Sequence, residues 1–205
     1  MGRREEHALK QLLRITILLI GLIWILAWAA AGHFDDTPNT QDGSESPLPS
    51  GEIAAPGERD SAKTLRVQIQ GEVQEMDMGT YLLGVLRAEM PASFEEEALK
   101  AQAIAARTYT LYRIRGGGSP NPPDADACDD HTCCKAYLSA EQAAANWGSM
   151  AVYYEEKLAR AVSETDGEVI LYDGAPILAV FFSSADGSTQ GAGDVWMNDL
   201  PYLQK

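Results

Sequence analysis

A long apolar segment near the N-terminus limits the folded part of this chain to one side of it. From Ile15 to Ala31 the sequence carries no charged residue, and roughly 20 such residues suffice to span a bilayer. The cations that precede the segment are Arg3, Arg4, Lys10 and Arg14. Asp35 and Asp36 follow it. Because positive charge stays on the cytoplasmic side, we predict a cytoplasmic N-terminus at 1–14, a transmembrane anchor at 15–32 and an extracytoplasmic remainder.

A cleavable signal peptide is the alternative interpretation of this segment. Ala29, Ala30 and Ala31 supply the small residues that a signal peptidase requires. The apolar run is, however, longer than the ~7–15 residues of a typical signal core. We therefore favour the anchor, which places this protein in the cell membrane with a single span.

The charge of the chain excludes one large class of partner. The net charge is −14, and the part that follows the anchor is more acidic than the whole because the anchor is preceded by cations. Nucleic-acid binding requires clustered cations, which this part lacks. We expect no nucleic-acid partner and attribute the acidity to solubility.

Composition divides the exported part in two. Residues 33–63 are rich in Pro, Gly, Ser, Asp and Glu, which is typical of a flexible linker. From Thr64 onward, Leu65, Val67 and Ile69 alternate with polar residues, so we predict a strand, a turn at Gly71 and a second short strand. We assign residues 64–205 to one folded domain.

Helices and a hairpin follow in the predicted domain. Each helix has a start or stop signal: Pro91 for the first, and serine capping boxes at Ser93 and Ser139 for two others. We predict helices over Thr80–Glu89, from Ser93 to about Arg115, from Ser139 to about Trp147 and over Tyr153–Glu164. Asp173 and Gly174 predict a tight hairpin between the apolar runs at 169–172 and 175–182. The fold class is α+β, with short antiparallel strands.

Glu89 is the first candidate for chemistry. It stands seven, four and three residues after Leu82, Val85 and Leu86, so it falls on the apolar stripe of its helix. Apolar surroundings favour the protonated carboxyl group, and a general acid must carry that proton. The alternative is that Glu89, in the last turn, faces outward or pairs with Arg87.

The segments around Glu89 resemble a known family. The matching motifs are Tyr81 to Pro91, Glu97 to Tyr109, Phe182 to Thr189, Asp194 to Trp196 and Leu200 to Tyr202. Together they resemble the stage II sporulation protein D family. This resemblance implies a membrane-anchored lytic transglycosylase that acts on peptidoglycan glycan strands during engulfment in sporulation, beside a cell-wall amidase that strips the stem peptides. It also implies that Glu89 is the catalytic acid.

One carboxylate is enough for such a reaction. An ordinary glycosidase needs two, whereas a lytic transglycosylase lets the 6-hydroxyl of N-acetylmuramic acid attack its own anomeric carbon. The same glutamate donates a proton and then recovers one. The product is a 1,6-anhydro sugar.

The resemblance implies further site residues. Lys100 and Arg107, which lie two turns apart on one helix face, are expected to line the cleft and to position substrate, as are Thr189 and Tyr202. From the residues alone, two solvated charges, a turn hydroxyl and a core aromatic are the simpler interpretation.

A cysteine cluster is the second unusual feature. Cys128, His131, Cys133 and Cys134 lie within one short stretch of a chain that holds 3 cysteines in total. Such crowding favours a structural zinc site. The resemblance implies that some relatives bind zinc here through a Cys and an adjacent His-Cys pair, whereas this chain has Cys133 at the expected histidine and His131 two residues earlier. A disulfide from Cys128 to Cys133 or Cys134 is the competing hypothesis for an exported protein.

Two other functions remain open. The family resemblance extends to proteins that stimulate cell-wall amidases, so a non-catalytic enhancer or glycan-binding module is one rival. A hydrolase with Asp186 or Asp194 as second carboxylate is the other. Because the family domain continues past the motif at Leu200 to Tyr202, we also expect that strands completing the fold are missing after Lys205.

Overall fold

The computed structural model describes residues 53–119, 124–182, 184–196 and 199–205. The predicted cytoplasmic segment, the anchor and most of the predicted linker lie outside these residues. None of the described helices is long and apolar enough to cross a membrane. Short strands come as two hairpins and one added strand between runs of helices, without regular alternation, which agrees with the predicted α+β class.

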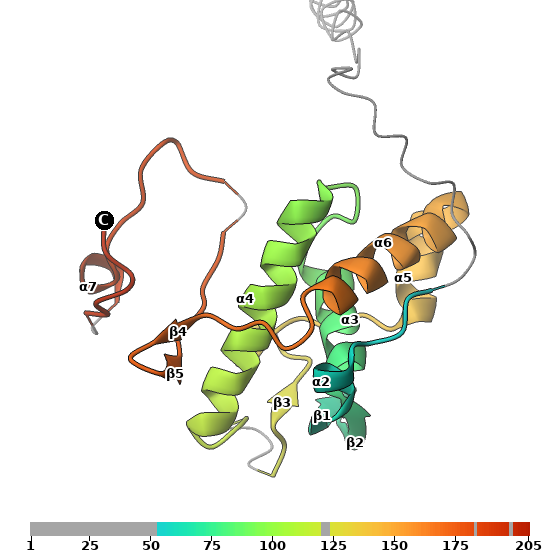
Figure 1. Ribbon diagram of the computed structural model, residues 1–205, viewed down its shortest axis with the longest axis horizontal. Helices are drawn as coiled ribbons and strands as arrows, with labels where there is room; N and C mark the ends of the chain where they lie inside the picture. Colours follow the sequence, from blue (N-terminus) through green and yellow to red (C-terminus); the bar gives the residue numbers. More distant parts are fainter. Residues whose placement is uncertain (1–52, 120–123, 183, 197–198) are drawn as a thin grey trace, which may run out of the picture. The chain divides into compact units, whose positions relative to one another are not determined.

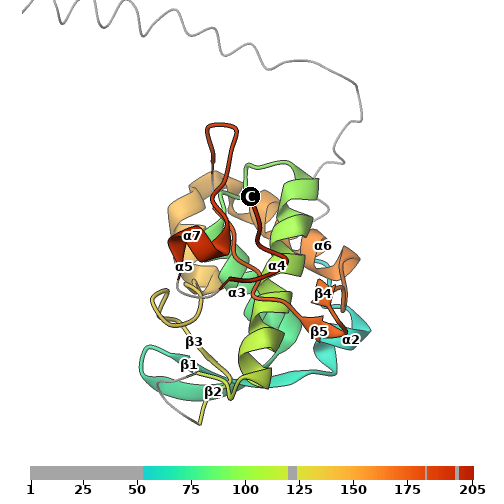
Figure 2. The same cartoon turned by 90° about the vertical axis from the view of Figure 1, so that its left-hand side faces the viewer.

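The elements follow one another along the chain, with the labels of Figure 1, as α2 (Glu58–Ser61), β1 (Thr64–Ile69), β2 (Glu72–Asp77), α3 (Met78–Glu89), α4 (Glu96–Arg115), β3 (Ala127–Cys128), α5 (Ala140–Trp147), a 3-10 turn (Gly148–Met150), α6 (Ala151–Glu164), β4 (Leu171–Tyr172), β5 (Ala175–Pro176) and α7 (Ala192–Val195). The β1–β2 hairpin lies at one end of α3 and α4 in both views (Figures 1 and 2).

The predicted first hairpin is confirmed. β1 and β2 are antiparallel, and Gln70 and Gly71 join them with φ angles of 52° and 88°. Two successive positive φ angles match the twist of a two-residue hairpin turn. Leu65 and Val67 are buried, and Val67 also pairs in parallel with Ala127 of β3. The hairpin thereby brings the segment that precedes the cysteine cluster against the core.

Helix α3 is the centre of the core. It begins at Met78, two residues before the predicted start, because the Asp77 side chain accepts a hydrogen bond from the Thr80 N–H at 2.9 Å. It ends at Glu89 as predicted, since Met90 is extended ahead of Pro91. Apart from Thr80, the residues from Met78 to Leu86 are buried, and the helix contacts α2, α4, α5 and α6.

The two predicted capping boxes have different outcomes. The box at Ser139 is confirmed, with reciprocal hydrogen bonds between Ser139 and Gln142. The box at Ser93 is wrong: α4 starts after Glu95, which makes no side-chain cap. Two backbone hydrogen bonds form turns at this helix start in place of the serine cap. The Phe94 N–H donates to the Pro91 carbonyl, and the Ala98 N–H donates to the Glu95 carbonyl.

The second hairpin is confirmed but shorter than predicted. Asp173 and Gly174 form the turn with φ angles of 49° and 74°. Only Leu171–Tyr172 and Ala175–Pro176 are paired as strands. In the described part of the chain, the apolar residues that continue after Pro176 have no strand partner, so the length of the apolar runs overestimated the strand length.

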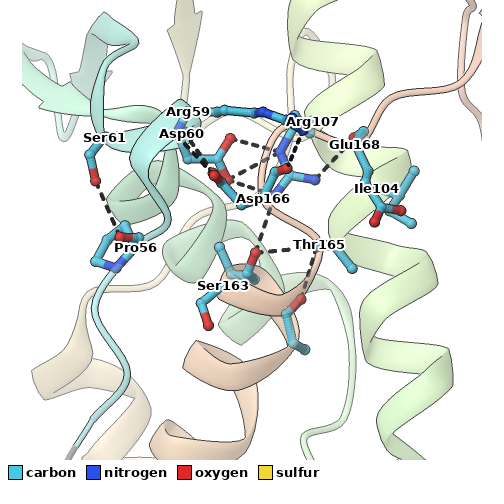
Figure 3. Close-up of polar contacts among 12 residues, drawn as sticks. Pro56, Arg59, Asp60, Ser61, Ile104, Arg107, Ser163, Thr165, Asp166 and Glu168 are labelled. Carbon is cyan, nitrogen blue, oxygen red and sulfur yellow. Dashed lines mark hydrogen bonds and ion pairs between the residues drawn. The ribbon is translucent and has the colours of Figure 1, made fainter.

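A buried ion pair joins α4 to α2, and further hydrogen bonds of the same arginine reach α6 (Figure 3). Arg107 of α4 is 1% exposed, and its Nη2 lies 2.6 Å from Oδ2 of Asp60 in α2. The same guanidinium donates to the carbonyl oxygens of Val162, in α6, and Glu168. These contacts bring together segments that are far apart in the sequence.

Asp166 completes this cluster. Its carboxylate accepts hydrogen bonds from the backbone N–H groups of Arg59 and Asp60, at 2.9 and 2.8 Å. Burial opposes ionisation, but these two hydrogen bonds hold the pKa of Asp166 below its usual range. Since α2 lies within residues 33–63, the end of the predicted linker is ordered against the domain.

We expect Asp60→Ala to destabilise the domain by about 3–5 kcal/mol, because it leaves the Arg107 charge buried without its partner. Urea unfolding followed by circular dichroism measures this change. Asp124→Ala is the matched control: it breaks the exposed Arg66–Asp124 pair, for which about 0–1 kcal/mol is expected. Equal losses in the two variants would contradict the assigned role of the buried pair.

Candidate functional site

Glu89 is held by a neighbouring backbone group. It is the last residue of α3 and is partly buried, and its Oε1 accepts a hydrogen bond from the Ala136 N–H at 2.9 Å. The alternative pairing with Arg87 does not form, because Arg87 binds Glu155 of α6, with Nε 3.0 Å from Oε2. Among the described residues no second donor to Glu89 is present, so Oε2 remains open to another partner.

Residues 135–138, which we call the strap, dock along α3 and carry Ala136 to the glutamate. The Leu138 N–H donates to the Gly84 carbonyl at 3.0 Å, and Arg87 Nη1 donates to the Leu138 carbonyl at 3.4 Å. The Tyr137 ring stacks on Tyr81 with centroids 6.2 Å apart. Several contacts thus hold the strap on α3, and its one hydrogen bond to Glu89 orients the carboxylate.

Gly84 explains why the strap can approach so closely. A Cβ atom at this position would lie 2.0 Å from the Tyr137 ring, which is far inside contact distance. Glycine in a helix interior ordinarily costs about 1 kcal/mol relative to alanine. Here the absent side chain makes room for the strap.

Lys135 is the cation of the site. Its Nζ lies 4.2 Å from the ring centroids of both Tyr109, in α4, and Phe181. Burial lowers the pKa of Lys135 below that of an ordinary lysine, and the charge of Glu89 partly opposes this effect. No pattern in the sequence predicts this role of Lys135, and the one available signal is a cation directly after Cys134 in an acidic domain.

The cysteine cluster lies immediately before the strap. The Sγ atoms of Cys128, Cys133 and Cys134 lie within 4.8 Å of one another, with separations of 2.6 Å for Cys128 to Cys133 and 3.5 Å for Cys133 to Cys134. His131 is exposed and outside this group. Of the predicted ligands, the structure thus brings together the three thiols.

The thiols differ in acidity. Burial raises the pKa of Cys134 to about 12. At Cys128 burial acts in the same direction, but hydrogen bonds from Cys133 and Cys134 outweigh it and lower the pKa of the Cys128 thiol. Cys128 is therefore the first thiol of the cluster to ionise.

Three cysteine sulfurs are ligands that zinc prefers, but the sulfur–sulfur distances in the structure do not all match those of a zinc site. Tetrahedral zinc with Zn–S bonds of about 2.3 Å holds sulfur atoms about 3.8 Å apart. The 3.5 Å separation of Cys133 and Cys134 is close to this value, whereas the 2.6 Å separation of Cys128 and Cys133 must widen by about 1 Å. Three thiols on one short loop can hold zinc after that small movement.

The other predicted substrate-binding residues lie apart from the contacts around Glu89. Arg107 is buried in its pair with Asp60, and Lys100 binds Glu164 and Glu97 at 2.7 and 2.8 Å, which raises the pKa of Lys100. The bonds of Lys100 link α4 to α6. Both cations have partners that stabilise the helix packing.

Thr189 and Tyr202 belong to the C-terminal segment. Thr189 and Asp186 line a pocket of about 520 Å³ that also includes Phe182 and Trp196. The Tyr202 hydroxyl accepts a hydrogen bond from the Leu178 N–H at 3.2 Å, and its ring packs on Tyr172. Asp194 lies in α7. The contacts that hold Tyr202 are thus separate from the hydrogen bond that holds the candidate acid.

These observations define the class of site: one partly buried glutamate, fixed by a backbone amide and flanked by a cation, at a helix end in an α+β domain. The family model described as "SpoIID: Stage II sporulation protein" matches residues 68–172, about half of the chain. This chain belongs to the SpoIID family. The matched residues include α3, α4, the cysteine cluster and the strap.

Individual relatives agree with the family assignment. The chain is 31% identical over 200 residues to stage II sporulation protein D of Bacillus amyloliquefaciens, covering 93% of this chain and 56% of that protein. It is 35% identical over 132 residues to the protein of the same name from Bacillus subtilis strain 168, covering 64% and 38%. An amidase enhancer of the same strain is 37% identical over 122 residues, covering 60% and 14%. The chain thus spans about half the length of the first relative and less of the others.

We expect Gly84→Ala to destabilise the domain by about 1–3 kcal/mol, opposite in sign to the usual effect of alanine in a helix, because Tyr137 must move. The measurement is urea unfolding. Gly116→Ala is the control, since a Cβ there would meet its nearest atom at an ordinary 3.5 Å. A more stable Gly84→Ala variant would show that the strap does not depend on this contact.

Proposed function

We propose that this chain is a peptidoglycan lytic transglycosylase with Glu89 as its catalytic acid and base. The observation that carries the proposal is the fixed carboxylate of Glu89, with Oε1 on the Ala136 N–H at 2.9 Å and Oε2 open. A general acid must be held where it can reach a substrate oxygen. Membership in the SpoIID family supports a role in sporulation and in cell-wall remodelling.

The reaction requires two proton transfers at one carboxyl group. Glu89 protonates the glycosidic oxygen that leaves N-acetylmuramic acid, and the bond from that oxygen to the anomeric carbon breaks. The 6-hydroxyl of the same sugar then bonds to the anomeric carbon and gives its proton to Glu89. A 1,6-anhydro end is formed, no water is consumed, and the glutamate returns to its starting form.

The biological setting follows from the predicted topology and the relatives. The anchor at 15–32 would hold the domain at the membrane, facing peptidoglycan. Its substrate would be glycan strands from which a partner amidase has removed the stem peptides. Thr189, Tyr202 and Lys100 remain proposed substrate contacts, whereas Arg107, which is 1% exposed and paired with Asp60, would support the site by holding α4 in place.

Zinc is the proposed structural cofactor. Cys128, Cys133 and Cys134 would hold it, with His131 or water as the fourth ligand. The metal would supply a cross-link of the loop that leads into the strap. It takes no part in the proposed proton transfers.

We expect the full chain to carry about one zinc per molecule and to lose thermal stability on chelation. Cys134→Ser should lower the zinc content measured by mass spectrometry and the melting temperature. His131→Ala separates the two candidates for the fourth ligand: it retains zinc if water is the ligand. Absence of zinc, together with a Cys128–Cys133 pair in non-reducing peptide mapping, would favour the disulfide hypothesis.

The second candidate function is a non-catalytic amidase enhancer. It is favoured by the 37% identity to the Bacillus subtilis amidase enhancer. Such a module would bind glycan or amidase without producing anhydro ends. The two functions differ in their dependence on Glu89.

We expect Glu89→Gln to lower the release of anhydro-muramyl products by about 10²–10⁴-fold, because glutamine keeps the size of the side chain but cannot transfer the proton. Mass spectrometry of digested glycan strands identifies these products. The control is Glu75→Gln, an exposed carboxylate on β2. Stripped glycan should still bind to Glu89→Gln. If the chain stimulates an amidase and Glu89→Gln does so equally, the enhancer is the correct function.

A further inference from the structure

Lys135 differs from Arg87, Arg107 and Lys100 in what surrounds it. Arg87 binds Glu155, Arg107 binds Asp60, and Lys100 binds a group of glutamates. The Lys135 ammonium instead lies between the rings of Tyr109 and Phe181, 4.2 Å from each centroid. Among the residues that the structure describes, it has no carboxylate within ion-pair distance and no hydrogen-bond acceptor.

This arrangement leaves an anion-binding group beside the candidate acid. An ammonium has three N–H donors, and aromatic faces attract its charge without accepting these hydrogen bonds in the way that a carboxylate does. Lys135 is consecutive with Ala136, whose N–H holds Glu89, and it is close enough for the two charges to interact. The candidate acid thus has a cation close to it whose donors are unused among the described residues.

The proposed substrate carries a matching anion. In N-acetylmuramic acid a lactyl group is attached to C3 of the sugar whose C1–O bond is broken. Its carboxyl group is a neutral amide while the stem peptide is attached, and it becomes a free carboxylate after an amidase removes the peptide. The charge thus appears a few bonds from the oxygen that Glu89 would protonate.

We propose that Lys135 binds the lactyl carboxylate and makes the site selective for glycan without stem peptides. The inference rests on the proposed function and assigns its specificity to one residue. Tyr109 and Phe181 keep the ammonium in place and partly shielded from water, which strengthens its attraction for an anion. An amidated muramic acid offers no charge for this contact.

The test compares two glycans of equal length: stripped strands, and the same strands with the lactyl carboxyl converted to a carboxamide. Binding is measured by calorimetry with the full chain carrying Glu89→Gln, so that no cleavage interferes. We expect the charged strands to bind about ten- to a hundredfold more tightly. Adding Lys135→Gln should remove this difference by weakening the binding of the charged strands alone.

Two control variants test whether the positive charge at position 135, rather than the net charge of the chain, gives the preference. Lys135→Arg retains the charge and should retain most of the preference. Lys63→Gln removes an exposed lysine with the same change in net charge and should leave the preference intact. If Lys135→Gln keeps the preference, or weakens the binding of both glycans equally, Lys135 does not recognise the carboxylate.

The proposed function is tested separately. A chain that releases no anhydro products, yet loses its charge preference on Lys135→Gln, would be a glycan-binding module in which Lys135 has the assigned role. A chain that releases anhydro products without any charge preference would be a transglycosylase in which Lys135 does not select the substrate.

Discussion

The buried pair of Arg107 and Asp60 is the interaction on which the helix arrangement depends. A guanidinium that is 1% exposed requires its partner, because an unpaired buried charge costs several kcal/mol. Asp60 comes from α2, and the carbonyl acceptors come from the end of α6 and from Glu168 beyond it. These segments must pack against α4 for the Arg107 guanidinium to have its ion-pair and hydrogen-bond partners. Helix α3 contacts all three helices, so its position follows from theirs.

The position of α3 matters because this helix serves both the core and the site. Leu82, Val85 and Leu86 are 0% exposed, whereas Glu89, one turn further, is only partly buried. The strap binds the same helix through Gly84. A change that shifts α3 therefore moves Glu89 and its backbone partner together, and loss of stability and loss of function need separate measurements at these positions.

Local patterns in the sequence predicted the parts of the fold that depend on neighbouring residues. The hairpins at Gly71 and Gly174, the end of α3 before Pro91 and the cap at Ser139 follow from backbone preferences over a few residues. The partner of Arg107 could not be predicted, because Asp60 lies 47 positions away within a segment of linker composition. Likewise, Glu89 was found from its helix periodicity, but no periodic signal connects it to Ala136 or Lys135, which come from an irregular loop.

The cysteine cluster and the candidate acid are connected through consecutive residues. Cys134 is followed by Lys135, which lies between two rings, and by Ala136, which holds Glu89. A disulfide from Cys128 to Cys133 would leave the Cys134 thiol outside the cross-link, with its N–H still bonded to the Asp130 carbonyl, whereas a zinc ion bound by all three thiols would include the residue next to Lys135. The two hypotheses therefore differ in how firmly they hold the strap. Because the orientation of Glu89 depends on the strap, a cross-link at these thiols would act on the site through the backbone of residues 134–136.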